Sequence, residues 1–432
     1  MRTGTLSDET IHDAVAVEAG WMEDLLVRLV EVPTTLGNEE PGQAIMEDAF
    51  RDCGLEPRSV HLDARALRVA EGASPFSWDV EGKRNVVAGW PAGGSGRGSG
   101  GRSLILNGHV DVVPPAAENL WTHPPFRAVR EGDWIYGRGA GDMKGGLAAM
   151  TGAVRALVRA GYAPAANVEL QSVVEEECTG HGALQCLLDG ARADACVITE
   201  PHPDHLTVSQ VGVLWFHVDI AGIPAHAARA SQLGFNAIDA AIELLAALRR
   251  HEAWLNESPP PPYDAFEHPI NLNPGVISGG DWPSTVAAAC TLSCRIGLYP
   301  GQDPEEARAG VEAAIAEAVA ASPRLAENPP RVRYDGFSCE GSVVGVDEPL
   351  VRTLSGAYEK LHGKRPPALA TTATTDARHF IRNGIPAVCF GPRGEQIHGI
   401  DERVSLRSVV ESARVLGLFI RDWCGLVPGR KE

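Results

Sequence analysis

The sequence predicts an α/β fold in which helices cover both faces of one sheet, with a smaller α+β module inserted into the chain. Apolar runs of strand length alternate with helical segments up to about residue 206, which is typical of such a sheet. From about Thr207 the order becomes strand, helix, strand, strand, helix, strand, as in a ferredoxin-like module. The first alternation resumes after about residue 342. We therefore expect two domains, formed by residues 1–206 with 343–432 and by residues 207–342.

Helical and strand-like segments alternate along the first part of the chain. Apolar residues recur at helical spacing over residues 10–31, which predicts one helix. The Gly/Ser-rich run PAGGSGRGSGGR (91–102) is expected to form a loop. The other predicted segments are helices over 42–54 and 145–161 and strands over 85–90, 103–113, 167–177 and 193–201.

The inserted module shows the same two periodicities. Apolar and polar residues alternate in STVAAACTLSCRIGLYPG (284–301), which indicates a strand with one buried face. Acidic residues occupy the first turn of a helix predicted over 303–322, where they suit the helix dipole. The other segments predicted in the module are strands over 206–222, 273–280 and 331–337 and a helix over 236–254. After the module, a helix is predicted over 348–363 and a strand over 386–392.

Composition excludes several classes of protein. The net charge of −18, from 38 Lys and Arg against 56 Asp and Glu, repels nucleic acid and anionic membranes, so neither is expected as a partner. The nine cysteines are odd in number and contain no CxxC pair, which argues against a disulfide scaffold or a Cys-type zinc site. Most are expected to be small buried side chains. The sequence has neither a signal-peptide pattern nor an apolar run of membrane-spanning length, so we expect a cytoplasmic protein.

Acidic residues and a histidine follow three of the predicted strands. His109 and Asp111 end the first, Glu175 to Glu177 the second, and Glu200 the third. Ligands gather at the carboxyl ends of strands in such sheets, so these side chains are candidates for one site. A metal-bound imidazole often donates its other N–H to a carboxylate, which suits the first pair. The alternative for His109 and Asp111 is a core histidine that is merely hydrogen-bonded to the aspartate. The alternative for the three glutamates is a solvated run of charge.

Asp142 lies in the glycine-rich segment GRGAGDMKGG (137–146). Glycine-rich loops also bind phosphate, but Lys144 is followed by Gly145 rather than by Ser or Thr. An anionic side chain at the centre of this loop favours a cation. His398, in QIHGIDE (396–402), adds a second imidazole near a strand end, although His398 or Glu200 alone could be structural.

Together these residues offer nitrogen and oxygen ligands without cysteine, which suits zinc better than cobalt or manganese. Two metal ions about 3.5–4 Å apart would need one bridging carboxylate. A run of three glutamates can supply one ligand and one free carboxylate that takes a proton from a bound water.

Five segments in order carry a resemblance to a known family: GHVDVVP, YGRGAGDMKGG, EEECTGHG, TEP and IHGIDE. Over residues 20–430 the chain resembles the di-zinc amidohydrolases that include aminoacylase, acetylornithine deacetylase, succinyl-diaminopimelate desuccinylase and carboxypeptidase G. The resemblance implies a zinc-exopeptidase-like mixed sheet sandwiched by helices, with an inserted lid and dimerisation domain. It also implies two Zn²⁺ per chain, with Co²⁺ or Mn²⁺ as substitutes, a homodimer, and hydrolysis of a small N-acylated amino acid or amine.

The resemblance assigns roles by position. His109, Asp142 and Glu200 would hold one zinc, while Asp142, Glu177 and His398 would hold the other. Asp142 would bridge the ions, and its peptide bond to Met143 would be cis. Asp111 would orient His109. Because Gly182 lies five residues after Glu177, the register makes Glu176 the general base.

The resemblance extends to substrate contacts. His226, in GIPAHAARA (222–230), would reach the partner subunit's site and stabilise the oxyanion, unless it is an ordinary loop histidine. Arg295 and Arg378 would bind a substrate carboxylate, although Arg378 could instead brace the fold through Asp376. Ser284 and Ala287 stand where many relatives have Asn and Pro, which weakens any transfer of substrate specificity.

Other functions remain open at this point. The same chemistry could serve a dipeptidase, a carboxypeptidase or a deformylase of a heterocyclic amine. The chain could also bind metal without catalysing hydrolysis, or bind a nucleotide through the glycine-rich loop.

Overall fold

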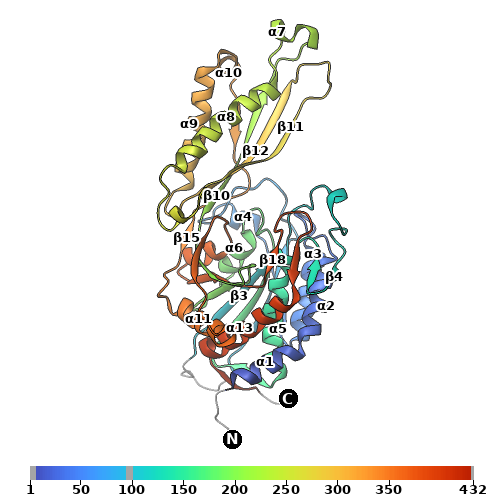
Figure 1. The fold of residues 1–432 in the computed structure, drawn as a ribbon, viewed down its shortest axis with the longest axis vertical. Helices are drawn as coiled ribbons and strands as arrows, with labels where there is room; N and C mark the ends of the chain where they lie inside the picture. Colours follow the sequence, from blue (N-terminus) through green and yellow to red (C-terminus); the bar gives the residue numbers. More distant parts are fainter. Residues whose placement is uncertain (1–5, 94–100, 430–432) are drawn as a thin grey trace.

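The fold is described from a computed structural model, which describes residues 6–93 and 101–429. A nine-stranded mixed sheet forms the lower part of the molecule (Figure 1). Its central strands β7, β3, β8 and β17 are parallel, as expected for strands that read as unbroken apolar runs. In sheet order the strands are β1 (Glu56–His61), β2 (Arg84–Trp90), β7 (Val168–Val173), β3 (Leu104–His109), β8 (Cys196–Ile198), β17 (Ala387–Cys389), β9 (Leu206–Gln210) and β15 (Ser342–Val343), with β16 (Ala368–Thr371) also paired to β9.

Helices cover both faces of this sheet, which confirms the predicted fold class. Leu104 and Leu106 of β3 face the larger core, while Ile105 between them faces the smaller one. The larger core is covered by α1 (Asp8–Val17), α2 (Ala19–Val30), α3 (Glu40–Asp52), α5 (Gly145–Arg159), α11 (Pro349–His362) and α13 (Leu406–Cys424). The smaller core is covered by α6 (His181–Leu188) and α12 (Ala377–Arg382).

The upper part is a five-stranded sheet with its own core. Its elements follow the order β10 (Gly212–Ala221), α8 (Ala237–Leu255), β11 (Leu272–Gly279), β12 (Ala289–Leu298), α9 (Pro304–Ala321) and β13 (Arg331–Arg333), with β14 (Ser338–Cys339) beside β10. The strand order β11-β12-β10-β13 and the antiparallel pairing are those of a ferredoxin-like module. Residues of α8 and α9 pack together with alternate residues of β10 and β12 in this core.

Strand pairing refines the expected boundary of the inserted module. The segment 206–222, expected to be one strand, forms two strands that meet at Val211. The first of these, β9, and the returning strand β15 pair with each other in the large sheet. We therefore propose a domain boundary slightly after Thr207, near residue 211, while the division itself stays a prediction.

One other expectation was wrong in detail. Residues 10–31 form two helices because Glu18 leaves the helical path between them. Its carboxylate turns inward and pairs with Arg155 at 2.7 Å and Arg159 at 3.3 Å. These partners lie on α5, so the apolar pattern of the first segment does not reveal them.

Three smaller points complete the fold. All nine cysteines are free and buried, as predicted. Most of the loop predicted over 91–102 lies outside the described residues. None of the helices in the described ranges has both the length and the apolar character needed to cross a membrane.

The short elements are α4 (Ala64–Leu67), α7 (Ala230–Leu233), α10 (Pro323–Glu327), β4 (Val129–Glu131), β5 (Trp134–Tyr136), β6 (Tyr162–Pro164), β18 (Gly394–Glu395), β19 (Arg403–Ser405) and β20 (Leu426–Pro428).

Candidate metal centre

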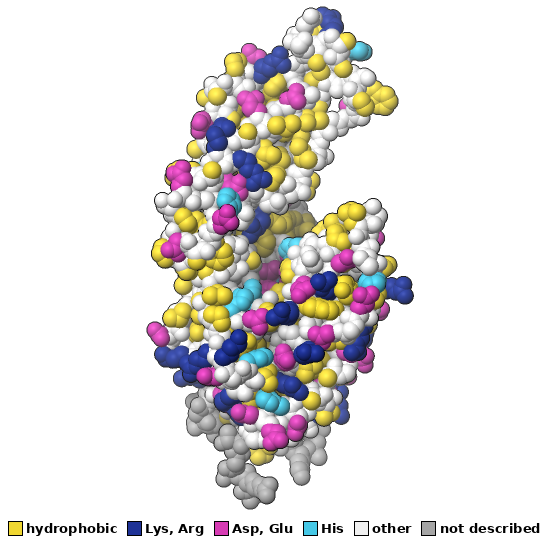
Figure 2. Space-filling model, viewed as in Figure 1, with side chains coloured by type: hydrophobic (Ala, Val, Ile, Leu, Met, Phe, Trp, Pro, Cys, Tyr) yellow, Lys and Arg dark blue, Asp and Glu magenta, His cyan; other side chains and the backbone are white. Residues whose placement is uncertain are grey.

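The carboxyl ends of adjacent parallel strands bring the predicted residues to one place. His109 is the last residue of β3, and Glu175 to Glu177 follow the neighbouring β7. Glu200 comes two residues after β8, on the other side of β3. A hollow between the two parts of the molecule has acidic and histidine side chains at its floor (Figure 2).

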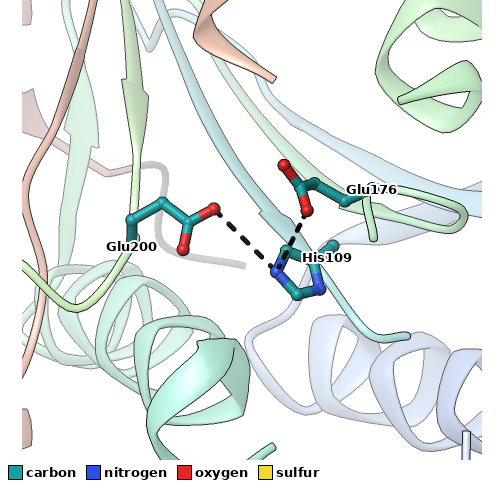
Figure 3. A group of neighbouring side chains, drawn as sticks. All are labelled: His109, Glu176 and Glu200. Atoms are coloured by element: carbon teal, nitrogen blue, oxygen red, sulfur yellow. Dashed lines mark ion pairs between the residues drawn. The ribbon is translucent and has the colours of Figure 1, made fainter. Parts of the chain in front are cut away.

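Two carboxylates approach the same ring nitrogen of His109. Glu176 and Glu200 point toward its Nε2 from two sides, each at 3.9 Å (Figure 3). All three side chains are nearly inaccessible to solvent. Their candidate ligand atoms lie within 4.8 Å of one another, as do those of His109, Asp142 and Glu177. Both groups have a geometry that could hold a metal ion.

Asp142 lies between the two histidines. Its Oδ1 is 3.1 Å from Nε2 of His109, and its Oδ2 is 3.4 Å from Nε2 of His398. The same nitrogen of His398 lies 3.1 Å from Glu177. One carboxylate that faces a different imidazole with each oxygen is the arrangement that a bridging ligand requires. The peptide bond between Asp142 and Met143 is cis, as expected.

Asp111 contacts His109 through two groups. Its backbone carbonyl lies 2.9 Å from Nδ1 of His109, and its carboxylate Oδ1 lies 3.7 Å from the same nitrogen. A carbonyl can only accept, so Nδ1 carries a hydrogen, and Nε2 faces the carboxylates of the cluster. The carboxylate of Asp111 accepts the backbone N–H groups of Glu176 at 3.3 Å and Glu177 at 3.0 Å. Asp111 thus fixes both the imidazole and the acidic turn.

The electrostatics of the cluster favour a cation at its centre. Burial raises the pKa of Glu176 and Glu200 well above the ordinary value, and the neighbouring carboxylates add to both shifts. Burial lowers the pKa of His109, but Asp142 and the other carboxylates outweigh it and hold the pKa well above the usual range. Positive charge at Nε2, from a proton or a metal ion, is therefore strongly stabilised.

Glu402 supports the loop that carries Asp142, a role the sequence did not reveal. Its Oε1 accepts the N–H groups of Gly141 at 3.0 Å and Asp142 at 2.9 Å. Its Oε2 accepts the N–H of Gly139 at 3.0 Å and pairs with Arg138 at 2.5 Å. Both side chains of this ion pair are fully buried. The glycine-rich loop is thus folded around a carboxylate from more than 250 residues later in the chain.

Glu402→Gln is expected to lower the free energy of unfolding by about 3–5 kcal/mol, because it leaves the buried Arg138 without its anion. Urea denaturation measures this change. Glu395→Gln is the matched control, since its pairing with Arg403 is partly exposed and should contribute less than about 1 kcal/mol. Equal effects of the two substitutions would contradict the support we assign to Glu402.

The glycine-rich loop is poorly placed to bind phosphate. Lys144 is fully buried, and its Nζ donates to the carbonyls of Leu29 at 2.8 Å and Val32 at 3.1 Å. A lysine committed to the backbone cannot contact a nucleotide in this arrangement.

In the part of the chain that the structure describes, none of the three predicted substrate-contacting residues forms a hydrogen bond or ion pair with a residue of the cluster. Arg295, on β12, reaches out of the upper part and donates to the carbonyl of Thr372 at 3.5 Å. His226 is exposed and caps the short turn that directly precedes α7, the helix at the far end of the upper part (Figure 1), and its ring accepts the N–H of Ala228. His226 therefore cannot act on the metal cluster of its own chain in this arrangement.

Arg378 is committed to the backbone. Its guanidinium donates to the carbonyls of Thr375 at 2.7 Å and Thr179 at 2.9 Å, and it stacks on Phe337. This is the geometry of a brace, the alternative to substrate binding. The hydrogen bonds run to backbone carbonyls, and the charge of Arg378 also opposes the rise in the pKa of Asp376 to about 6 that burial causes. Both oxygens of Asp376 lack a hydrogen-bond partner among the described residues.

Several proteins of known structure have a similar fold. Human carnosine dipeptidase 1 superposes with a TM-score of 0.76 at 15% identity and covers 97% of this chain and 100% of its own. The dipeptidase Dug1p of Saccharomyces cerevisiae gives a TM-score of 0.78 at 13% identity, over 98% and 99%. The Bacillus subtilis YXEP protein, a dinuclear metal binding peptidase from the M20 family, gives 0.58 at 15%, over 94% and 99%.

Proteins related in sequence indicate the family as well as the fold. An N-formyl-4-amino-5-aminomethyl-2-methylpyrimidine deformylase of Bacillus subtilis (strain 168) is 29% identical over 379 residues, 82% of this chain and 86% of the relative. A succinyl-diaminopimelate desuccinylase of Paracoccus denitrificans (strain Pd 1222) is 31% identical over 362 residues, 78% and 86%. Residues 105–422 match the model of peptidase family M20/M25/M40. The chain therefore belongs to peptidase family M20/M25/M40 and is a metal-dependent hydrolase of amide C–N bonds.

Proposed function

We propose that this enzyme removes an acyl group from a small N-acylated amino acid or amine with the help of two zinc ions. The position of Asp142 carries the proposal, because its two oxygens face His109 and His398 separately. The ligand sets would be His109, Asp142 and Glu200 for one ion and Asp142, Glu177 and His398 for the other. Nitrogen and oxygen donors without cysteine also accept cobalt or manganese, so the identity of the metal is part of the proposal.

Glu176 is the proposed general base. Bound cations would supply Lewis acidity, which lowers the pKa of water and polarises the amide carbonyl. Glu176 lies beside His109, and its Oε1 is buried without a hydrogen-bond partner in the described residues. This oxygen can take a proton from the attacking water and return it to the departing amine nitrogen. Glu177 cannot share this role while it holds His398.

Arg295 is the proposed binding group for a substrate carboxylate. Within residues 6–93 and 101–429 its guanidinium forms no ion pair, and its single hydrogen bond is long. A largely buried cation without an anion is costly, and a carboxylate on the substrate would relieve that cost. This observation favours an N-acyl amino acid over a neutral amine.

The inserted module is the proposed lid and dimerisation domain. His226 lies too far along it to serve its own cluster, so we propose that it stabilises the oxyanion in the partner subunit's site of a homodimer. Cytoplasmic location is the accompanying proposal.

A deformylase is the second candidate. The relative from Bacillus subtilis acts on an N-formyl aminopyrimidine, whose name includes no acidic group. Such a substrate would leave Arg295 without an ionic partner.

The test is hydrolysis of a panel of N-acetyl and N-succinyl amino acids, dipeptides and N-formyl amines by zinc-loaded enzyme, with Arg295→Ala alongside. We expect acyl amino acids to be cleaved, and Arg295→Ala to lower their kcat/KM about 10- to 100-fold, mainly through KM, because a charged hydrogen bond contributes about 1.5–3 kcal/mol. N-formyl amines should be unaffected by the substitution.

Arg333→Ala is the matched control, since Arg333 lies on the same sheet and pairs with Asp219. Cleavage of N-formyl amines alone, with no effect of Arg295→Ala, would establish the deformylase instead. No cleavage of any amide would refute the proposed function.

A further inference from the structure

We infer that Glu175 and Trp78 are positioning residues that hold the turn on which Glu176 lies. The inference rests on the proposed function, because it concerns the proposed general base. Within residues 6–93 and 101–429, neither side chain forms a hydrogen bond or ion pair with a histidine or carboxylate of the cluster. Their effect would be transmitted through the backbone of the acidic turn.

Glu175 has the backbone conformation that makes such support necessary. Its φ of +62° lies in the left-handed region, which a residue other than glycine rarely adopts without compensation. Its carbonyl accepts the N–H groups of Thr179 at 3.0 Å and Gly180 at 2.7 Å, which closes the turn. The side chain of Glu175 is completely buried. A change at this position would therefore act directly on the direction in which Glu176 leaves the turn.

Three groups donate hydrogen bonds to the buried carboxylate of Glu175, and Nδ1 of His181 lies 3.5 Å from its Oε2. Lys83 donates to Oε1 at 2.7 Å, and the indole N–H of Trp78 donates to the same oxygen at 2.9 Å. Thr179 donates to Oε2 at 3.0 Å. Lys83 also pairs with Glu39 at 2.9 Å, so its removal would disturb two carboxylates. Trp78 is the sharper probe, because its indole N–H has this one acceptor among the described residues.

The two sides of the acidic turn are thus held by different groups. Asp111 accepts the N–H groups of Glu176 and Glu177, while Trp78 and Lys83 hold the side chain of Glu175. Three adjacent glutamates therefore have three tasks: an anchor, a base and a metal ligand. Catalytic geometry is sensitive to displacements of about 1 Å, so loosening the anchor should reduce turnover before it reduces binding.

The segment that carries Trp78 also contacts the inserted module. The carbonyl of Pro75 accepts the N–H of Gly336 at 2.7 Å, and Oγ of Ser74 accepts the N–H of Ser338 at 3.1 Å. The carbonyl of Ser74 contacts Nε2 of His181, in the same turn as Glu175, at 3.1 Å. Residues 74–78 therefore connect the acidic turn to the segment 335–338 of the module. Trp78 lies in a segment that is hydrogen-bonded on both sides.

The test is Trp78→Phe, which removes the N–H donor and keeps an aromatic ring. We expect kcat to fall about tenfold on the best substrate of the panel, with KM, zinc content and Tm close to those of the parent enzyme. Trp423→Phe is the matched control, because that indole donates to the carbonyl of Ser103 at 3.0 Å away from the acidic turn. A kcat of Trp78→Phe within twofold of the parent enzyme would overturn the inference.

A double substitution separates positioning of the base from a general structural effect. If Trp78 acts through Glu176, Trp78→Phe should cause no further loss of rate in the Glu176→Gln enzyme. The same tenfold loss in that background would overturn the inference while leaving the proposed function intact. Full activity of Glu176→Gln alone would instead refute the proposed base, so the two failures are distinguishable.

Discussion

Glu176→Gln is expected to lower kcat about 10²- to 10⁴-fold, the usual contribution of general acid–base catalysis. Glutamine preserves the shape of the side chain but cannot take a proton from water or return one to the amine. Glu176 is also the carboxylate whose Oε1 lacks a hydrogen-bond partner, so its removal breaks no recorded side-chain hydrogen bond. Steady-state kinetics on the best substrate of the panel measure the loss.

The zinc content of the variant distinguishes loss of the general base from loss of a metal ion. The proposed ligand sets do not include Glu176, so Glu176→Gln should retain two ions per chain. Glu169→Gln, on the same strand β7, is the control and should leave kcat within about twofold. Turnover near the parent value in Glu176→Gln would contradict the assigned role, and loss of an ion would make Glu176 a ligand.

Removal of the bound cations is expected to abolish hydrolysis and to lower Tm. Without them the cluster gathers Asp142, Glu176 and Glu200 around one imidazole, and burial makes their charges costly. An ion that binds only the folded chain stabilises it by about 4 kcal/mol at a concentration 1,000 times its Kd. A chelator should therefore reduce both activity and stability.

Readdition separates a metal effect from irreversible damage. Zinc returned after dialysis should restore activity and Tm together, and titration should reach about two ions per chain. Calorimetry and activity assays on the same samples measure both. Activity that survives complete removal of metal would contradict the proposed chemistry.

Much of the fold could be predicted because buried parallel strands leave a strong sequence signal. The runs that became β3, β7 and β8 are apolar and bounded by polar residues, and the inserted module keeps its strand–helix order. The break at Glu18 could not be predicted, since its partners Arg155 and Arg159 lie on α5. Local periodicity carries no information about a contact more than 130 residues away.

Most candidate ligands could be named because they lie near the ends of predicted strands, and Asp142 because it lies in a glycine-rich segment, while their division between two ions came from the family resemblance. The residues that hold these ligands in place could not be predicted. Glu402 reaches Arg138 across 264 residues, and Trp78 reaches Glu175 across 97. Asp111 was named, but the sequence could not show that its backbone carbonyl lies closer to His109 than its carboxylate does.

The contact between residues 74–78 and the segment around Gly336 has a mechanical consequence. It lies beside the acidic turn at one end of the inserted module, whereas His226 lies at the other end. If the module rotates about this contact, the lever arm is short at the turn that carries Glu176 and long at His226. The same angular motion would sweep His226 through a wide arc and scarcely displace the base.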